Sequence, residues 1–375
     1  MIEFKKVSKY FKDKAIIKEI DLKINKGELV VLIGPSGCGK TTTLKMINKL
    51  ITNTSGKIYV NGKDISEQNT IELRRSIGYV IQQTGLFPHL TVGENIGIIP
   101  KLEKWPENNI KEKIVELLNM VGMKPEEYID RYPSELSGGQ QQRIGVARAF
   151  ATNPDIILMD EPFSALDPIT RNQLQDELFN LQQELKKTIV FVTHDMDEAL
   201  KLGDRICIMN EGKIVQFDVP EQILKNPANI FVEEFVGKNR IWKQPEFIKA
   251  KDIMIFEPIK TNSNRTILQA LEIMKSNKVD SLLIINKNGI LEGIVTVKDL
   301  RKADNKSLKL SEIMEKEVKT VNKEDSLIDI LNKMNEYKVG YMPVVDDNYK
   351  LLGLITKSSL LTVLSNQYIN KEMEE

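Results

Sequence analysis

The chain has 375 residues, with 53 Lys plus Arg against 53 Asp plus Glu and a formal net charge of +0 at pH 7. Its length exceeds what one hydrophobic core usually supports and predicts two or three domains, while the balanced charge excludes a nucleic-acid partner held by bulk electrostatics. Two cysteines, Cys38 and Cys207, are too few for a disulfide framework and predict free thiols in a reducing compartment.

The N-terminal sequence MIEFKKVSKYF lacks the apolar stretch of a secretory signal. The apolar runs along the chain are far shorter than the ~20 residues that span a bilayer, so we expect no membrane-crossing segment. Short runs such as LVVLI, DIILM and TIVFV alternate instead with helical patterns such as RNQLQDELFNLQQEL. This alternation predicts an α/β fold with buried parallel strands, in a first domain covering residues 1–237.

The first chemical motif is GPSGCGKT, which follows the apolar strand LVVLI and precedes the helical run TTTLKMINKL. This is the strand, loop and helix context of a phosphate-binding loop. Backbone N–H groups and the helix N-terminus bind phosphates there, Lys40 reaches the β and γ phosphates, and Thr41 holds Mg²⁺. The residues expected to contact the nucleotide are Gly34, Pro35, Ser36, Gly37, Cys38, Gly39, Lys40, Thr41 and Thr42.

A second glycine-rich turn, SGGQ, lies in the stretch ELSGGQQQRIGVARA at Glu135 to Ala149. Ser137 and the backbone N–H groups of Gly138 and Gly139 stand where a helix begins, which is a favourable place for an anion. The same residues could also cap the helix with no ligand. The sequence alone leaves both interpretations open.

Three polar residues follow two further apolar strands. Asp160 and Glu161 end the run IILMDE, and His194 follows TIVFVT. The carboxyl ends of parallel strands meet at one edge of a sheet, so these residues are expected beside the phosphate loop. Asp160 would support Mg²⁺ through its water shell, Glu161 would polarise the attacking water, and His194 would bond a γ-phosphate oxygen. The alternative is that the two acids end a strand in solvent and that the histidine is structural.

The last third of the chain contains an internal repeat. LEGIVT at Leu291 recurs as LLGLIT at Leu351, and DIM at Asp252 recurs as EIM at Glu312, both with a spacing of 60 residues. We predict a linker at 238–250 and two α+β units at 251–310 and 311–370 that share one core. Each unit is expected to contain a short strand, a helix, two strands and a last helix, before a polar and frayed C-terminal NKEMEE.

With the segment LSGGQ, the first domain resembles the ATP-binding cassette proteins. The phosphate loop, Gln82, the signature, the two acids, the turn SALD at Ser164 to Asp167 and His194 occur in the order of that family. The resemblance implies a nucleotide-binding domain with a parallel sheet core, an antiparallel subdomain and a helical subdomain, which hydrolyses ATP with Mg²⁺.

The resemblance also implies roles that spacing cannot show. Two copies would face head to tail, and the signature residues Ser137, Gly138, Gly139 and Gln140 would cap the nucleotide bound by the partner copy. Asp167 would contribute to this composite site. Gln82 would join Thr41 and Asp160 in sensing Mg²⁺. An aromatic residue ahead of the first strand would stack on adenine, and the spacing favours Phe11 over Tyr10.

The stretches TGLFPHLTVGENI and DEPFSALDPITR are similar to those of ATPase subunits of bacterial importers. This implies a peripheral protein on the cytoplasmic side of the membrane that binds separate permease subunits. A solute-binding protein would interact with it only indirectly, through the permease. The loop Phe87 to Thr91 would receive a permease segment, or it is an ordinary loop. Likeness over nearly the whole chain extends to the importers of quaternary-amine osmoprotectants: glycine betaine, carnitine, choline and proline betaine.

The repeats resemble CBS domains, which pair and often bind adenine nucleotides. The implied ligand is cyclic di-AMP, with ionic strength as an alternative signal. The hydroxyl and acid pair Thr296 and Asp299 fits the family pattern, whereas the second repeat has Thr356 and Ser359 and lacks the acid. The same spacing is also that of a helix N-cap, which needs no ligand. The candidate regulatory residues are Val279, Ser281, Thr296, Asp299, Tyr341, Ile355, Thr356 and Lys357.

Three other functions compete with an osmoprotectant importer. The protein could be the ATPase of an importer for another small solute. It could be a soluble cassette ATPase acting on DNA or ribosomes, although it lacks the second cassette or basic patch typical of that class. It could also be a nucleotide-sensing module, against which the intact Glu161 and His194 argue.

Overall fold

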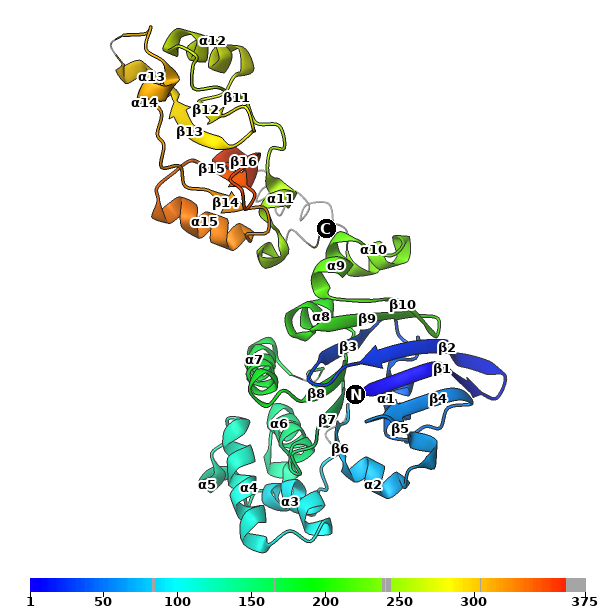
Figure 1. Cartoon of the computed structure of the whole chain (residues 1–375). Helices are drawn as coiled ribbons and strands as arrows, with labels where there is room; N and C mark the ends of the chain where they lie inside the picture. The colour runs from blue at the N-terminus through cyan, green and yellow to red at the C-terminus, as the bar shows by residue number, and fades with distance from the viewer. Residues whose placement is uncertain (83–84, 165, 238–239, 241–243, 304, 362–375) are drawn as a thin grey trace. The chain divides into compact units, whose positions relative to one another are not determined.

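The computed structural model describes residues 1–82, 85–164, 166–237, 240, 244–303 and 305–361. The chain forms two compact units, Met1–Gly237 and Lys238–Glu375 (Figure 1). Five positions of the predicted linker, 238–239 and 241–243, lie outside the described residues. So do residues 362–370 of the predicted second repeat and the C-terminal NKEMEE.

The centre of the first unit is a six-stranded sheet with the order β10-β9-β3-β8-β7-β6. Its strands are β3 (Leu29–Ile33), β6 (Ile77–Val80), β7 (Ile156–Asp160), β8 (Thr188–Val192), β9 (Arg205–Asn210) and β10 (Lys213–Asp218). The first five are parallel, and β10 runs antiparallel to β9 at the edge. Every residue of β3, β7 and β8 is buried, because both faces of the sheet are covered. The predicted α/β fold with buried parallel strands is confirmed.

An antiparallel sheet packs against one face of the central sheet. Its order is β2-β1-β4-β5, with β1 (Ile2–Phe11), β2 (Lys14–Ile24), β4 (Ser55–Val60) and β5 (Lys63–Asp64). Alternate residues of β1 and β2, such as Phe4 and Leu22, form one hydrophobic cluster with Val30, Leu32 and Val190 of the central strands. This cluster also buries helix α1 (Lys40–Ile47), which fixes the helix that follows the phosphate loop.

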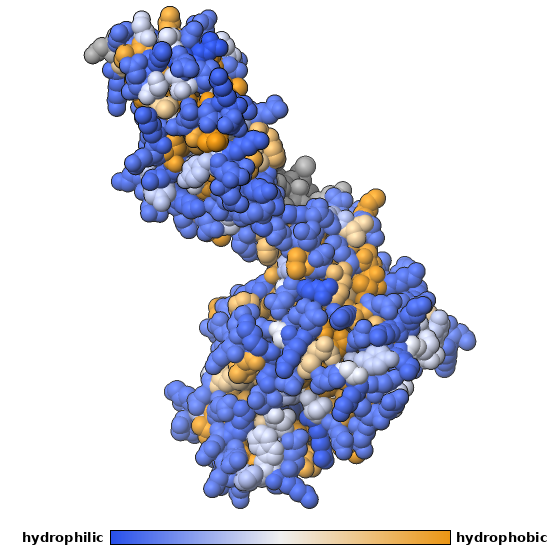
Figure 2. Space-filling view, in the orientation of Figure 1, coloured by the Kyte–Doolittle hydropathy of each residue, from blue (hydrophilic) through white to orange (hydrophobic). Residues whose placement is uncertain are grey.

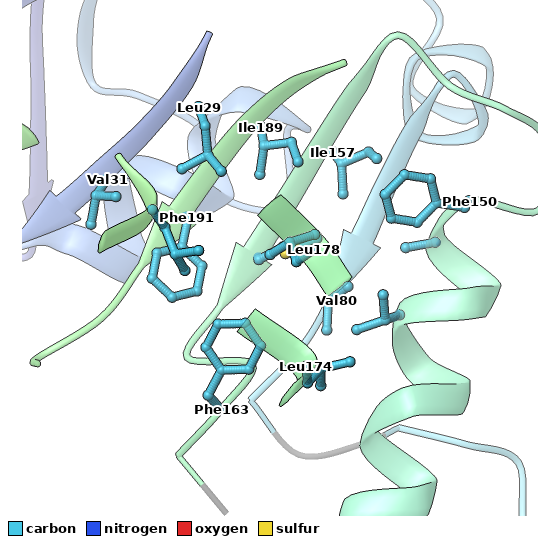
Figure 3. Close-up of a cluster of buried hydrophobic side chains, with 14 of the residues drawn as sticks. Leu29, Val31, Val80, Phe150, Ile157, Phe163, Leu174, Leu178, Ile189 and Phe191 are labelled. Carbon is cyan, nitrogen blue, oxygen red and sulfur yellow. The ribbon is translucent and has the colours of Figure 1, made fainter. Parts of the chain in front are cut away.

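Helices cover the other face of the central sheet. Figure 3 shows this core, in which Phe191 of β8 and Phe163 have ring centroids 5.5 Å apart, and Leu174 and Leu178 pack nearby. The remaining helices of the unit are α2 (Thr70–Arg75), α3 (Val92–Leu102), α4 (Glu107–Met120), α5 (Pro125–Tyr128), α6 (Gly138–Ala149), α7 (Pro168–Leu185), α8 (Met196–Leu202), α9 (Pro220–Lys225) and α10 (Ile230–Val236). Helices α3 to α6 form a layer of their own in Figure 1.

The second unit contains the predicted duplication. The first repeat has β11 (Lys260–Thr261), α12 (Ile267–Asn277), β12 (Ser281–Ile285), β13 (Leu291–Thr296) and α13 (Val297–Lys302). The second has β14 (Val321–Asn322), α15 (Leu327–Glu336), β15 (Tyr341–Val345) and β16 (Leu351–Thr356), and residues 357–361 are helical. The duplication reaches the strand register: Ser281 pairs with Thr296 as Tyr341 pairs with Thr356, and both hairpins have an irregularity at the corresponding step.

The packing of the second unit does not follow the sequence repeat. Helix α11 (Ala250–Ile253) packs into the core of the second repeat, and α14 (Leu310–Ile313) packs into the core of the first. Each repeat thus has a core of its own, and a small third cluster with Leu283, Ile294 and Leu354 joins them. The prediction of one shared core is therefore wrong, because most buried apolar side chains belong to one of two separate cores.

On the faces shown in Figure 2, hydrophilic residues cover most of the surface of each unit, and hydrophobic residues occur in small groups. Within the described ranges no helix combines the length and apolarity that a membrane crossing requires. Both cysteines are buried free thiols, as predicted.

We expect Phe191→Ala to lower the free energy of unfolding of the first unit by about 3–5 kcal/mol, because it leaves a cavity against Phe163. Chemical denaturation followed by far-UV circular dichroism measures this loss. Phe179→Ala is the matched control, since Phe179 is a partly exposed residue of α7, and it should cost less than about 1 kcal/mol. Equal losses in the two variants would contradict the packing described here.

Candidate functional site

The loop from Gly34 to Gly39 connects β3 to α1, which begins at Lys40, as the sequence predicts. Two of its glycines are required by geometry. Gly34 has φ +153, and a Cβ there would lie 2.1 Å from the carbonyl oxygen of Met209. Gly39 has φ +107 at the N-cap of α1, and a Cβ there would lie 2.3 Å from Cδ1 of Ile17. Only glycine lets the backbone turn this closely against its neighbours.

The side chain of Lys40 is enclosed by the loop that precedes it. Its Nζ donates to the carbonyl oxygens of Gly34 at 2.7 Å and of Pro35 at 3.1 Å, and the residue is only 7% exposed. Buried charges must be hydrogen-bonded, and these two carbonyls meet that need. A cation is thus held at the centre of the loop, where a phosphate would be bound.

Asp160 ends β7 and lies beside the start of α1. The Thr41 hydroxyl donates to Asp160 Oδ1 at 2.8 Å, and Lys45 Nζ lies 3.9 Å from Oδ2. Burial raises the pKa of the Asp160 carboxyl above its ordinary value, although the hydrogen bond from Thr41 and the charge of Lys45 oppose the shift. The sequence analysis missed Lys45, which the helical periodicity of α1 could have placed near the loop.

A hydroxyl and a carboxylate oxygen are the ligand types that Mg²⁺ prefers. The described residues contain no group of three or more His, Cys, Asp or Glu side chains that would cage a metal unaided. Thr41 and Asp160 therefore fit an ion that takes its other ligands from water and from a bound triphosphate.

Glu161 stands at the carboxyl edge of the sheet with φ 49, and its N–H donates to Val192 O at 3.0 Å. Gln82 Nε2 donates to Glu161 Oε2 at 2.9 Å, and His194 Nδ1 lies 3.5 Å from the same oxygen. The positive φ is rare for a residue with a side chain, and strained residues of this kind cluster at active sites. The ends of three strands thus converge on one carboxylate.

These residues open onto a cavity of about 720 Å³. Phe11 lines it, whereas Tyr10 is not among the lining residues, which agrees with the preference for Phe11 from spacing. Lys14 and Ile16 also line it, and no sequence motif pointed to them. The complete lining is Phe11, Lys14, Ile16, Ser36, Gly37, Gly39, Lys40, Thr41, Thr42, Gln82, Glu161 and His194.

The signature residues form a helix cap. Ser137 Oγ accepts from the N–H of Gln140 at 3.3 Å, and Gln140 Oε1 accepts from the N–H of Ser137 at 2.9 Å. In the first turn of α6, Gly138 is exposed and Gly139 is half-buried. None of the four lines the cavity beside the phosphate loop. One chain alone therefore does not bring its signature to its own phosphate loop.

Asp167 caps helix α7. It accepts from the N–H groups of Ile169 and Thr170, both at 3.1 Å, and its hydrogen bonds with Thr170 lower the pKa of its carboxyl. Ser164 Oγ donates to the Glu161 carbonyl at 3.0 Å, which ties this turn to Glu161. Ala165 of the SALD turn lies outside the described residues.

In the second unit, Thr296 and Asp299 cap α13. The Thr296 hydroxyl donates to Asp299 Oδ2 at 2.6 Å, and the Thr296 N–H donates to the same atom at 2.9 Å. Thr356 and Ser359 make the corresponding cap in the second repeat. The helix-cap interpretation is confirmed for Thr296 and Asp299, while the ligand interpretation stays a prediction.

The other candidate regulatory residues differ in their burial and in the core against which they pack. Ile355 is fully buried in the core of the second repeat, and its part in a ligand site stays a prediction. Val279 packs against the core of the first repeat, Ser281 is buried in β12, and Lys357 is exposed. Tyr341 packs against the cluster that joins the repeats, and burial together with the charge of Glu315 raises the pKa of its phenol.

Comparison with protein families shows two matches. The family described as ABC transporter matches residues 17–164, and the family described as CBS domain matches residues 250–306 and 310–366.

Relatives match over nearly the full chain. The glycine betaine/carnitine/choline transport ATP-binding protein OpuCA of Bacillus subtilis (strain 168) is 50% identical over 366 residues, which is 97% of this chain and 96% of the relative. The choline transport ATP-binding protein OpuBA of the same organism is 49% identical over 377 residues, covering 100% of this chain and 99% of OpuBA.

The dimeric post-hydrolysis structure of the ATP-binding cassette MJ0796 bound to ADP and Pi has a TM-score of 0.55 and 36% identity, covering 59% of this chain and 99% of that one.

We expect Lys40→Ala to weaken MgATP binding by about 10- to 100-fold, because a charge-assisted hydrogen bond contributes roughly 1.5–3 kcal/mol. Titration with a fluorescent ATP analogue measures the affinity. Lys26→Ala removes an exposed lysine that does not line the cavity and should bind as the wild type does. Unchanged affinity in Lys40→Ala would contradict the assignment of the loop.

Proposed function

Because the chain belongs to the ABC transporter family and hydrolyses ATP, we propose that it is the ATP-binding subunit that powers import of quaternary-amine osmoprotectants such as glycine betaine, carnitine and choline. The observation that supports this most is the 50% identity to a glycine betaine/carnitine/choline transport subunit, which extends through the cassette and both CBS repeats. Import of another small solute is the alternative, since no residue of the site is assigned to solute recognition.

The phosphate loop binds the triphosphate of ATP. Lys40 exchanges the carbonyl oxygens of Gly34 and Pro35 for the β and γ phosphates, and Phe11 stacks on the adenine from the same cavity. Thr41, Gln82 and Asp160 would hold Mg²⁺, partly through water, and an ion held there would neutralise charge on the phosphates. Ser36, Gly37, Cys38, Gly39 and Thr42 complete the cradle.

Glu161 is the general base that takes a proton from the attacking water. Its Oε2 accepts a hydrogen bond from Gln82 and lies close to His194. When the nucleotide is in place, this oxygen leaves its side-chain partner and accepts from the attacking water instead. His194, with 67% of its side chain exposed, bonds the γ phosphate. A positioned general base is typically worth about 10²–10⁴ in rate.

A second copy of the chain completes the site. The signature residues Ser137 to Gln140 lie away from their own phosphate loop, and the similar cassette MJ0796 is described as dimeric. In a head-to-tail pair, the first turn of α6 and Asp167 of one copy reach the triphosphate of the other. The partly exposed first turn of α6 supplies backbone N–H groups and a positive dipole end.

The permease binds beside helix α3, which places the subunit at the cytoplasmic side of the membrane. The loop Phe87 to Thr91 is held by Asn95, whose amide donates to the carbonyls of Phe87, Leu90 and Thr91 and accepts from the N–H of Phe87. Next to it, a cavity of about 600 Å³ lies between α3 and α4. A rigid loop beside a groove suits a helical segment of a membrane partner, and the solute-binding protein takes part only through that partner.

The CBS unit regulates transport through cyclic di-AMP or ionic strength. Tyr341 supports a nucleotide ligand, since its aromatic ring lies where the two repeats meet. Ionic sensing is supported by exposed ion pairs from Lys249 and Lys251 of the α11 segment to Glu324 of the second repeat. Hydrogen bonds from these lysines lower the pKa of Glu324 to about 2, and salt screens exposed pairs of this kind.

We expect Glu161→Gln to reduce the ATPase rate about 10²- to 10⁴-fold with little change in MgATP affinity, because the variant keeps the shape but cannot accept the proton. The rate and the uptake of labelled glycine betaine are measured with the permease in reconstituted vesicles. Glu184→Gln, an exposed residue of α7, is the control and should behave as the wild type. Turnover equal to the wild type in Glu161→Gln would rule out this mechanism, and ATPase without uptake would reject the proposed solute.

We expect calorimetric titration of the full chain with cyclic di-AMP to release heat at micromolar ligand, and Tyr341→Ala to abolish it through loss of the stacking ring. Tyr349→Ala, an exposed aromatic of the same repeat, is the control. If the wild type gives no heat, ionic sensing remains, and the ATPase rate should then respond to salt in the wild type but not in Glu324→Gln.

A further inference from the structure

A buried carboxylate lies behind the site and takes no part in binding nucleotide. Glu198 of α8 is 7% exposed, and burying a carboxylate is costly unless it is well paired. Its Oε2 accepts from the Thr193 hydroxyl at 2.6 Å, and its Oε1 accepts from Gln175 Nε2 at 3.3 Å. Arg171 Nε lies 4.0 Å from Oε1.

The contact with Thr193 reaches the segment that carries His194. The Thr193 hydroxyl donates to Glu198 and accepts from the N–H of Asp195 at 3.0 Å, so the residues just before and just after His194 are joined to each other and to Glu198. The His194 side chain is mostly exposed, and its recorded polar contact is with Glu161. The position of His194 is therefore set through its backbone, which Glu198 holds by way of Thr193.

The contact with Arg171 reaches the turn that ends at Asp167. Arg171 Nη2 donates to the carbonyl of Leu166 at 3.0 Å. Its Nε is buried and has no hydrogen-bond partner among the residues that the structure describes. The guanidinium thus lies between the Glu198 carboxylate and the backbone of this turn. Its unpaired Nε is the atom that lies near Glu198.

A polar cavity of about 30 Å³ links these groups to the chemistry. It is lined by Glu161, Ser164, Arg171, Thr193, His194, Asp195 and Glu198. Its volume is about that of one water molecule. The general base, the histidine and the buried carboxylate therefore border one small space.

We propose that Glu198 is a positioning residue for ATP hydrolysis, which holds the His194 segment through Thr193 and the turn of Asp167 through Arg171, so that the two segments adopt their catalytic positions together. The inference rests on the roles proposed above for Glu161 and His194. It assigns a function to a residue outside the nucleotide cavity, and it predicts an effect on turnover rather than on nucleotide affinity.

The test is steady-state ATPase kinetics of Glu198→Gln in the complex with its permease. The variant keeps the size of the side chain but removes the charge that pairs with Arg171 and the second acceptor oxygen. We expect kcat to fall at least about 10-fold, with KM for ATP unchanged. Glu184→Gln should match the wild type.

A double variant separates a positioning role from a general structural one. Because Glu198 acts partly through His194, the loss of turnover in Glu198→Gln combined with His194→Ala should be smaller than the two single losses combined. Additive losses would overturn the proposal, as would a kcat of Glu198→Gln within about 2-fold of the wild type while His194→Ala is impaired. Unchanged turnover in His194→Ala would instead reject the proposed function itself.

If Glu198→Gln does not fold, two variants of Thr193 decide the matter. Thr193→Ser keeps the hydroxyl and should retain turnover, whereas Thr193→Val has nearly the same shape but cannot donate to Glu198 and should lose about 10-fold in kcat. Equal turnover in these two variants would contradict the proposed link.

Discussion

The positions of Asp160, Glu161 and His194 depend on the backbone register of β7 against β8. Asp160 pairs with Val192, and the N–H of Glu161 continues the ladder by donating to the Val192 carbonyl. The two acids and the residues after β8 are therefore fixed at one level of the sheet. A shift of one residue would turn Asp160 to the opposite face and away from Thr41. The buried apolar strands maintain this register, because both faces of the sheet are covered.

The polar groups of the site are paired with one another when no nucleotide is bound. Lys40 bonds backbone carbonyls, Thr41 bonds Asp160, and Gln82 bonds Glu161. In the proposed function, ATP replaces internal hydrogen bonds such as those of Lys40. Such an exchange limits the desolvation cost of the groups and keeps them close to their working positions. Glu198 extends this arrangement to a second layer, in which buried partners hold the backbone rather than the substrate.

The second unit shows how a duplicated sequence becomes one body. Each repeat takes a short helix from the other part of the chain, since α11 packs with the second repeat and α14 with the first. Antiparallel bridges from Ile255 to Leu354 and from Ile294 to Glu315 add backbone hydrogen bonds to this exchange. The two repeats are therefore joined through α11 and α14 as well as through the third cluster.

Local patterns in the sequence determined the phosphate loop, the buried strands, the acids at the end of β7 and the 60-residue repeat. They did so because glycine conformations, apolar runs and helix caps depend on neighbouring residues. The sequence could not give the contact between Thr41 and Asp160, the positive φ of Glu161 or the lining of the cavity by Lys14. Nor could it show that Ile355 faces the core or that α11 and α14 are exchanged. These features join residues far apart in the chain, and only the register of the strands and the packing of the layers bring them together.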